Sequence, residues 1–256
     1  MGGQTITRWD LLSTPELDRV ARGTPVVLPI AATEQHGPHL PLATDRLIVD
    51  YLVAELDQRL GEGVLILPTI AVGCSDSHLS FAGTLSVAHE TLLGYIEAII
   101  DSVFAAGFSD VIVLNAHGGN QGVTQVAFER LGTRHADRRV AWTSWWRLAG
   151  PELLSVSESG PGGVGHACEL ETSIMLVLAP DLVHGDLAPE RANAPAIDYD
   201  DGDMLRAGRV SLYRRSEQIA PSGVFGDPRR ASRETGQAAL AVIADALERL
   251  VLSLAE

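Results

Sequence analysis

Val26–Ala31 reads VVLPIA, and after a polar loop the helical pattern of Asp45–Leu60 follows it. A short run rich in Val and Ile, bounded by Pro and polar residues, is typical of a buried parallel strand. Three later runs have the same character: Val64–Ile70 (VLILPTI), Asp110–Asn115 (DVIVLN) and Val140–Trp145 (VAWTSW). We therefore predict four strands in one sheet.

Helical patterns, with apolar residues at three- and four-residue spacing, lie between these runs over Asp45–Leu60, His89–Ala106 and Gln121–His135. This alternation predicts a doubly wound α/β fold, with a mostly parallel sheet covered by helices on both faces. A length of 256 residues fits one domain or at most two. We predict a single domain over residues 1–256.

The later part of the chain has weaker patterns. Gly150–Gly165 is rich in Gly and Ser and predicts a long loop, which leads into the apolar run Leu170–Ala179. Asp181–Asp227 is polar and irregular, which indicates surface loops or an arm that contacts another subunit. Pro228 is expected to open a last helix that runs to Leu254, because proline is favoured in a first turn.

The charge of the chain excludes several functions. There are 33 acidic side chains against 19 basic ones, for a net charge of −14, and every basic residue is arginine. Without lysine there is no Walker A phosphate loop and no Schiff-base chemistry. A chain this acidic is also a poor match for nucleic acid or anionic lipid. We expect no nucleic-acid partner and no membrane partner.

Features of the termini and cysteines predict a cytoplasmic protein. The first residues, MGGQTITRWDLL, lack the basic start and apolar stretch of a signal peptide. No segment approaches the ~18 uninterrupted apolar residues that span a bilayer. Cys74 and Cys168 form no CxxC pair, which is typical of a reducing compartment.

Polar clusters follow the predicted strands. The loop Thr33–Asp45 reads TEQHGPHLPLATD, in which Glu34 and His36 alternate on an extended segment and can point the same way. A second cluster, NAHGGN, covers Asn115–Asn120, and a third, HACELETS, covers His166–Ser173. Ligands bind at the carboxyl ends of strands in open α/β sheets, so these clusters are candidates for one site.

Histidine usage indicates a metal. A single loop histidine is more often hydrogen-bonded than metal-bound, but five of the eight histidines lie in such loops: His36, His39, His78, His117 and His166. Mixed sets of histidine and carboxylate suit zinc, manganese or iron, and a carboxylate can bridge two ions. We predict a metal site on these loops.

The clusters together resemble the creatininase family of amidohydrolases. TEQHGPHLPLATD is similar to the family signature, NAHGGN to its second motif and HACELETS to its third. SFAGTLS (Ser80–Ser86) and GVFGDP (Gly223–Pro228) match two further family segments, in the family's order. The resemblance implies a three-layer α/β/α sandwich, two divalent metal ions, hydrolysis of a C–N bond and assembly into homo-oligomers, often hexamers.

The resemblance also implies roles for individual residues. Glu34 and His117 would hold one metal and His36 the other, and Asp45 would bridge the two ions. Glu171 would be the last ligand or the base that acts on the water.

Other residues of the motifs have two interpretations each. His166 would donate the proton to the leaving nitrogen. Glu169 is either catalytic or a helix-start carboxylate favoured by the helix dipole. His78 and Ser80 either line the substrate side or are structural.

One departure from the family separates this chain from creatininase itself. That enzyme has a glutamate ligand two places after the histidine of the second motif, where this chain has Gly119. The chain therefore resembles the NGHGGN-type branch, which includes formamide deformylases of pterin and flavin precursor pathways and peptidases that trim the mycofactocin precursor peptide. The spellings FAGT and GVFGDP favour the peptidases. Gly118 and Gly119 would lie beside the substrate.

Three further features have structural explanations that compete with functional ones. Trp142, Trp145 and Trp146 are expected in the core, although Trp145 could instead form a wall for a planar substrate. Gly160–Gly165 satisfies G-x-G-x-x-G, but no strand precedes it, so we expect an active-site loop and no dinucleotide. Cys168 is expected to be a buried thiol rather than a nucleophile.

These observations predict a hydrolase that acts on an amide C–N bond of a small molecule or short peptide. Two cations make water acidic enough to attack near neutral pH. Within the family, a mycofactocin precursor peptide peptidase, a creatinine amidohydrolase and a formamide deformylase are the alternatives. A non-catalytic binding or scaffold subunit of the same fold is the alternative from another class.

Overall fold

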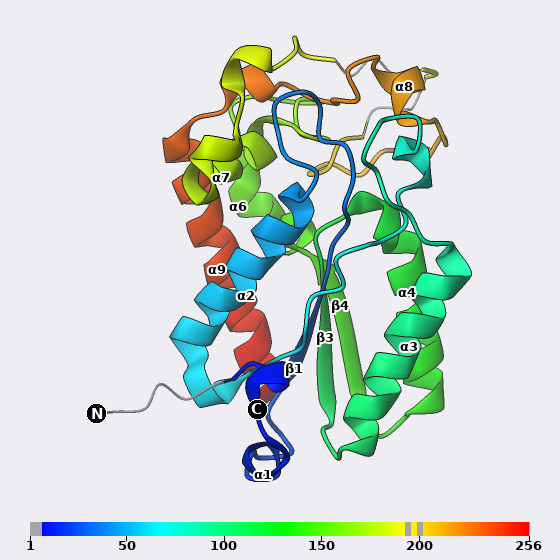
Figure 1. The fold of residues 1–256 in the computed structure, drawn as a ribbon, viewed down its shortest axis with the longest axis vertical. Helices are drawn as coiled ribbons and strands as arrows, with labels where there is room; N and C mark the ends of the chain where they lie inside the picture. The colour runs from blue at the N-terminus through cyan, green and yellow to red at the C-terminus, as the bar shows by residue number, and fades with distance from the viewer. Residues whose placement is uncertain (1–6, 193–195, 199–201, 256) are drawn as a thin grey trace.

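The computed structural model describes residues 7–192, 196–198 and 202–255. Its centre is a parallel sheet in the order β2-β1-β3-β4 (Figure 1). The strands are β1 (Val26–Ile30), β2 (Leu65–Ile66), β3 (Asp110–Asn115) and β4 (Arg139–Ser144). The chain starts in the middle of the sheet, moves to one edge and then crosses to the other side. The predicted doubly wound α/β architecture is confirmed.

Helices cover both faces of this sheet (Figure 1). On one face lie α2 (Thr44–Leu60), α7 (Glu169–Leu178) and α9 (Arg233–Ala255), and on the other lie α3 (His89–Ala105) and α4 (Gln121–Arg134). The result is the three-layer sandwich that the family resemblance implied.

The strands are buried on both faces, as their unbroken apolar character predicted. Successive side chains of a strand point to opposite faces. In β3, Ile112 and Leu114 therefore join the core under α2 and α9, while Val111 and Val113 join the core under α3 and α4. This double burial gives the sheet two apolar cores and positions its carboxyl edge rigidly.

Strand lengths differ from the prediction. Regular pairing of β2 covers only Leu65–Ile66, although the apolar run continues to Ile70. Pro68 has no N–H to continue the ladder, and the chain meets β1 again only at the isolated bridge between Ile70 and Ile30. At β4, the strand ends at Ser144, so the predicted strand end at Trp145 is wrong.

Helices also begin at other places than expected. Trp145 starts the short α5 (Trp145–Leu148), and α6 (Gly150–Val156) occupies the first half of the predicted loop Gly150–Gly165. The last helix begins at Arg233, because Ser232 accepts the Thr235 amide hydrogen bond through its hydroxyl and so caps the first turn.

The segment Asp181–Asp227 is irregular, as predicted, and its one short α-helix among the described residues is α8 (Ser216–Ile219). Residues 193–195 and 199–201 of this segment, and residues 1–6 and 256 of the predicted domain, lie outside the described residues. No helix in the described ranges is both long and apolar enough to cross a membrane.

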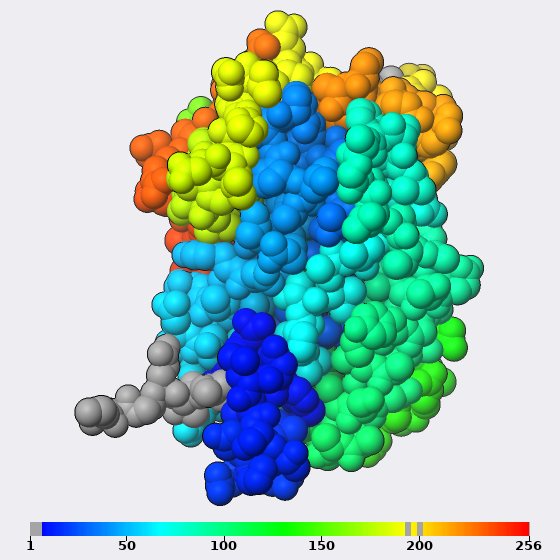
Figure 2. Space-filling view, viewed as in Figure 1, coloured from blue at the N-terminus to red at the C-terminus, as the bar shows by residue number. Residues whose placement is uncertain are grey.

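Several long loops lie together at the carboxyl edge of the sheet. Figure 2 shows the blue loop after β1 between the teal segment before α3 and the yellow segment after α7. Hydrogen bonds tie these neighbours together, from the Leu85 amide to the Thr33 carbonyl (2.9 Å) and from the His184 amide to the His39 carbonyl (2.9 Å). The site lies beneath this cover.

Candidate metal centre

Residues far apart in the sequence come together at this edge. Glu34 and His36 come from the loop after β1, Asp45 from the first turn of α2, His117 from the end of β3, and Glu171 from the first turn of α7. All five are buried, with at most 5% of their surface exposed. The geometry brings together the five residues that the sequence assigned to metal.

Their nitrogen and oxygen atoms lie close to one another. His117 Nδ1 is 3.2 Å from Glu34 Oε1 and 3.3 Å from Asp45 Oδ2. His36 Nε2 is 3.1 Å from Asp45 Oδ1. Two groups of possible ligand atoms, all within 4.8 Å of each other, share Asp45: one with Glu34 and His117, the other with His36 and Glu171. A third group joins Glu34, His36 and His166.

The chemistry of these atoms fits a cation. Both carboxylate oxygens of Glu34, Asp45 Oδ2 and His36 Nε2 are buried and have no hydrogen-bond partner among the described residues. Buried polar atoms without partners cost free energy unless something else satisfies them. A divalent ion satisfies carboxylates and a neutral imidazole at once.

Each of the two histidines is oriented through its second ring nitrogen. His36 Nδ1 lies 3.2 Å from the Glu34 carbonyl, and His117 Nε2 lies 2.9 Å from the Cys74 carbonyl. A carbonyl only accepts, so these nitrogens carry the proton and the opposite nitrogens face the carboxylates. Metal-binding histidines are commonly held in this way.

The cluster shifts the pKa values of its own members. Burial alone would lower the pKa of His36, but the Asp45 carboxylate raises it to about 9. Burial also opposes charge on His117, yet Glu34 and Asp45 hold its pKa well above the usual value. Burial would raise the pKa of Glu34, and His117 holds it well below instead. Protons on the imidazoles balance carboxylates that stay ionised, and a divalent ion would replace those protons.

The pKa of Glu171 shifts in the opposite direction to that of Glu34. Burial raises its pKa to about 7, with His36 opposing that rise. Its carboxylate also accepts a hydrogen bond from the Cys168 amide (3.4 Å), which caps α7. A carboxylate with a pKa near neutrality is suited to exchange protons at physiological pH.

His166 faces the same carboxylate as His117. Burial holds its pKa well below the usual value, so its imidazole is neutral. Nε2 lies 2.7 Å from the Gln35 carbonyl and therefore carries the proton, which leaves Nδ1 as an acceptor 3.5 Å from Glu34 Oε1. Two acceptor atoms at this distance require a proton or a cation between them.

His78 lines the cavity, and a network behind it fixes its ring. Its Nδ1 accepts a hydrogen bond from the Gln35 side-chain amide (2.7 Å) and lies 3.0 Å from the Ser216 hydroxyl. Its Nε2 is 3.6 Å from Glu34 Oε1. Burial lowers the pKa of His78 to about 4, so it too is neutral.

The second motif is built around His117. The Asn115 side chain accepts a hydrogen bond from the His117 amide and donates one to its carbonyl (3.1 and 2.7 Å). Gly119 then passes so close to the preceding loop that a Cβ there would lie 2.1 Å from the Cys74 carbonyl oxygen and 2.5 Å from His117 Nε2. This backbone accepts no side chain at position 119, so the glutamate ligand of creatininase has no place here.

Two other candidates lie away from the metal cluster. Ser80 is exposed and donates its hydroxyl hydrogen bond to Glu217 (2.7 Å), so it does not line the cavity. Glu169 is fully buried but accepts hydrogen bonds from the Ser157 hydroxyl and from the amides of Glu158 and Ser159. Its first-turn position and these donors fit the structural interpretation of Glu169.

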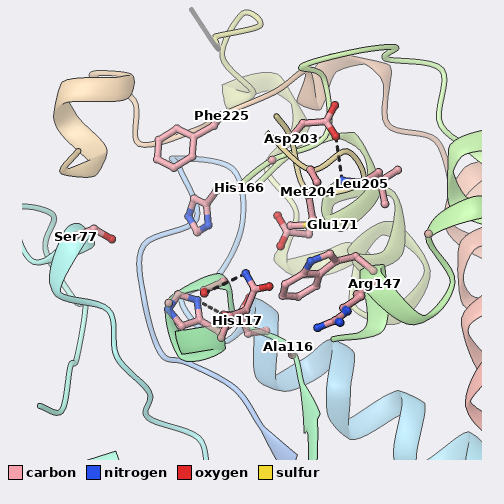
Figure 3. A pocket seen from close by; sticks show the side chains of 18 of the residues that line it. Ser77, Ala116, His117, Arg147, His166, Glu171, Asp203, Met204, Leu205 and Phe225 are labelled. Carbon is pink, nitrogen blue, oxygen red and sulfur yellow. Dashed lines mark hydrogen bonds and ion pairs between the residues drawn. The ribbon is translucent and has the colours of Figure 1, made fainter. Parts of the chain in front are cut away.

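The cluster opens into a cavity of about 830 Å³. Figure 3 shows His117, His166 and Glu171 directed into it from three different elements. His78, Gly118 and Gly119 line it as well. Trp145 is fully buried in the core, and its neighbour Trp146 lines the cavity instead. Both residues belong to α5, which begins at Trp145 directly after β4, and so the helix directs their side chains differently.

Sequence reasoning missed three features of this region. Gln35 lies between Glu34 and His36 in the first motif and is buried; its side-chain amide donates to His78, and its backbone carbonyl accepts from His166. The Asn115 side chain holds the backbone of His117, and its place at the start of NAHGGN was the available signal. Either Trp145 or Trp146 could form a wall of the site from the sequence, which favoured Trp145, and only the start of α5 shows that Trp146 lines the cavity.

Comparison with known proteins agrees with this geometry. The family model for creatininase, described as creatinine amidohydrolase, matches residues 10–251. This chain belongs to the creatininase family.

Among the family's curated members, a mycofactocin precursor peptide peptidase of Mycobacterium ulcerans (strain Agy99) is 32% identical over 228 residues, covering 86% of this chain and 81% of the relative. A creatinine amidohydrolase of Pseudomonas putida is 29% identical over 249 residues, covering 90% of this chain and 91% of the relative. A solved creatininase structure named with Mn has a TM-score of 0.79 at 25% identity, covering 96% of this chain and 98% of that one. The chain is therefore an amidohydrolase of this family.

Proposed function

We propose that this amidohydrolase cleaves an amide C–N bond of a short peptide, using water activated at a two-metal centre. The observation that carries the proposal is the shared Asp45, which lies in two adjoining groups of buried ligand atoms whose hydrogen-bond needs are unmet. Glu34 and His117 would hold one ion and His36 the other, with Glu171 either as a further ligand of the second ion or as the base that acts on the water. Zinc, manganese and iron suit this mixture of imidazole and carboxylate.

When bound, the two ions supply positive charge that acidifies water and stabilises negative charge on the carbonyl oxygen. Glu171, with a pKa of about 7, can accept a proton from the attacking water. His166 enters the reaction neutral, so the proton that its Nδ1 gives to the leaving nitrogen would first come from the attacking water, either directly or through Glu171. Gln35 keeps that ring oriented through its carbonyl.

Two observations favour a peptide over creatinine. The cavity of about 830 Å³ is much larger than a single small ring, and the relative from M. ulcerans is named a peptide peptidase. The absence of a ligand side chain at Gly119 also separates this site from that of creatininase. Creatinine is the second candidate substrate, because the chain is also similar to the creatinine amidohydrolase of P. putida.

The test begins with chelated protein reloaded separately with zinc, manganese or iron. Each form is offered short peptides, creatinine and formamido-pyrimidines, while bound metal is measured by mass spectrometry. We expect close to two ions per chain and turnover of peptides. Fewer than one tightly bound ion, with no turnover of any C–N substrate, would favour the scaffold alternative and overturn the proposal.

Two further properties are proposed with this function. The two cysteines, which are buried and form no disulfide, support a cytoplasmic location. Family membership supports a homo-oligomer, with a hexamer as the assembly to test. Light scattering coupled to size-exclusion chromatography decides this, and a monomer at all concentrations would contradict it.

A further inference from the structure

The wall of the cavity opposite the loop before α3 carries a cation. Arg147 lies on α5, and in Figure 3 it is across the cavity from Ser77. It is the one arginine among the residues that line the cavity, and the chain contains no lysine. Of the histidines that line the cavity, His117 belongs to the metal cluster, and His78 and His166 are neutral. Arg147 is therefore the cationic side chain available to bind a substrate.

Arg147 has no carboxylate partner. Within residues 7–192, 196–198 and 202–255, no Asp or Glu oxygen lies within 4.0 Å of its guanidinium. Its carbon Cζ instead lies 5.0 Å from the ring centroid of Trp142. Trp142 is held in turn by a hydrogen bond from Nε1 to Gln125 Oε1 (3.0 Å). Stacking restricts the guanidinium while leaving its N–H donors free.

The acidic side chains that line the same cavity are already engaged. Asp45 and Glu171 belong to the metal groups. Asp203 accepts hydrogen bonds from the amides of Gly162, Leu205 and Arg206. Among the residues that the structure describes, none therefore supplies an anion to this face of Arg147.

The surroundings of Arg147 fit the body of a peptide. The apolar side chains that line the same cavity are Trp146, Leu154, Met204, Leu205 and Phe225. Gly118 also lines the cavity, and the space beside it is empty, because a Cβ there would meet no atom within 4 Å. An extended substrate can therefore pass from the metal cluster along an apolar wall to the guanidinium.

We propose that Arg147 binds a carboxylate of the substrate and so selects anionic peptides over neutral ones. The inference rests on the proposed function, because it concerns the same cavity. Arginine presents paired N–H donors that match a carboxylate, which lysine does not. The carboxylate has two possible sources, a free C-terminus or an Asp or Glu side chain. In a chain with a net charge of −14, one local cation also offsets the general repulsion of an anionic substrate.

The experiment uses three peptides of one sequence with the metal-loaded enzyme. One has a free C-terminal carboxylate, one has a C-terminal amide, and one has the amide with an internal Ala replaced by Asp. Wild-type enzyme should show a kcat/KM about tenfold higher for at least one carboxylate peptide than for the neutral amide, mainly through KM. Whichever carboxylate peptide is preferred identifies the source.

The variant Arg147→Gln should lose this preference by lowering kcat/KM for the carboxylate peptide alone. Arg147→Lys should restore only part of it. Arg19→Gln changes an exposed arginine just after the short helix α1 (Thr14–Leu17), at the far end of the sheet (Figure 1). It matches the change in net charge and should keep the wild-type preference. Equal rates for all three peptides with wild-type enzyme, or a preference that survives in Arg147→Gln, would overturn the proposal.

Binding separates this proposal from the proposed function. The same peptides are titrated calorimetrically into chelated wild-type protein and chelated Arg147→Gln protein, where no turnover occurs. Tighter binding of a carboxylate peptide by the wild type, lost in the variant, supports the role of Arg147 even if loaded enzyme cleaves none of them. Cleavage without any such difference in binding or kcat/KM leaves the proposed function standing and refutes the role of Arg147.

Discussion

Two buried glutamates, Glu169 and Glu171, lie in the first turn of α7, and their surroundings meet their hydrogen-bonding needs in opposite ways. Glu169 accepts hydrogen bonds from Ser157, from the Glu158 amide and from both the amide and hydroxyl of Ser159. Glu171, two residues later, faces the cavity and the imidazole of His36, and its carboxylate accepts a long hydrogen bond (3.4 Å) from the Cys168 amide.

The difference extends to the neighbours of each carboxylate. The donors around Glu169 come from the segment after α6 and complete its hydrogen bonding without any ligand. Around Glu171, the buried oxygens of Glu34 and Asp45 have acceptor capacity that no described residue fills. A buried charge that the chain completes stabilises the fold, whereas a buried charge left incomplete calls for a ligand.

The largest effect is expected from Asp45→Asn, because Asp45 belongs to both metal groups. Asparagine keeps the shape but removes the charge and one oxygen ligand. We expect kcat/KM to fall at least about 10³-fold, which corresponds to ~4 kcal/mol of transition-state stabilisation. Bound metal should fall below one ion per chain, as measured by mass spectrometry.

Asp50→Asn is the matched control for this change, since Asp50 lies on the same helix and pairs with Arg46 on its exposed side. It should keep both metal content and activity. An Asp45→Asn protein that still holds two ions would contradict the assignment of Asp45 as the shared ligand.

Glu169→Gln is expected to act on stability alone. The variant loses charge-assisted hydrogen bonds to several donors, which should lower the free energy of unfolding by about 2–3 kcal/mol. Urea unfolding of chelated protein measures this without a contribution from metal binding. Glu152→Gln, at a half-buried position of α6 whose carboxylate pairs with Arg249 only at 3.7 Å, should change the same free energy by less than about 0.5 kcal/mol. Loss of metal from Glu169→Gln at unchanged stability would make Glu169 part of the site.

The pH dependence of stability should differ between metal-free and loaded protein. The pKa of His36 is about 9 in the folded protein, above its ordinary value of 6.5. Its stabilising contribution is therefore complete below pH 6.5 and is lost as the pH rises through 9. Thermal unfolding of chelated protein should show Tm falling by about 3 °C or more over this range. Excess zinc or manganese should offset the fall, because metal binds the neutral imidazole. A metal-free Tm that rises between pH 6.5 and 9 would contradict this.

The smallest effect is expected from Thr172→Val, at the position that directly follows Glu171 on α7. The Thr172 hydroxyl is 3.0 Å from Nε2 of the buried His39, in the loop that carries Glu34 and His36. Burial lowers the pKa of His39 to about 4, so the pair is neutral. Its loss should cost about 1 kcal/mol of unfolding free energy. Metal content should not change, and a fall in metal stoichiometry would show that this pair positions the ligands.

Much of the fold was predictable from local patterns. The apolar runs of β1 and β3 and the periodicity of α2, α3 and α4 identify elements that need no distant partner to be recognised. Weaker patterns failed where packing decides the structure. The seven-residue α6 forms inside a Gly- and Ser-rich stretch because Leu153 is fully buried in the core under α9.

The candidate ligands were also predictable, because parallel strands bring their carboxyl ends to one edge. Glu34, His36 and His117 follow strands directly, and any doubly wound order would gather them. The sequence by itself therefore determined the sheet, the edge and the kind of chemistry found there.

Only the tertiary structure decided which of two near neighbours faces the site. Glu169 and Glu171 are two residues apart on one helix, and Trp145 and Trp146 are adjacent, yet in each pair one side chain lines the cavity and the other does not. A rotation of about 100° per helical residue separates these directions, and the position where each helix begins sets that rotation. Packing against the sheet determines that starting position, and no local pattern in the sequence specifies it.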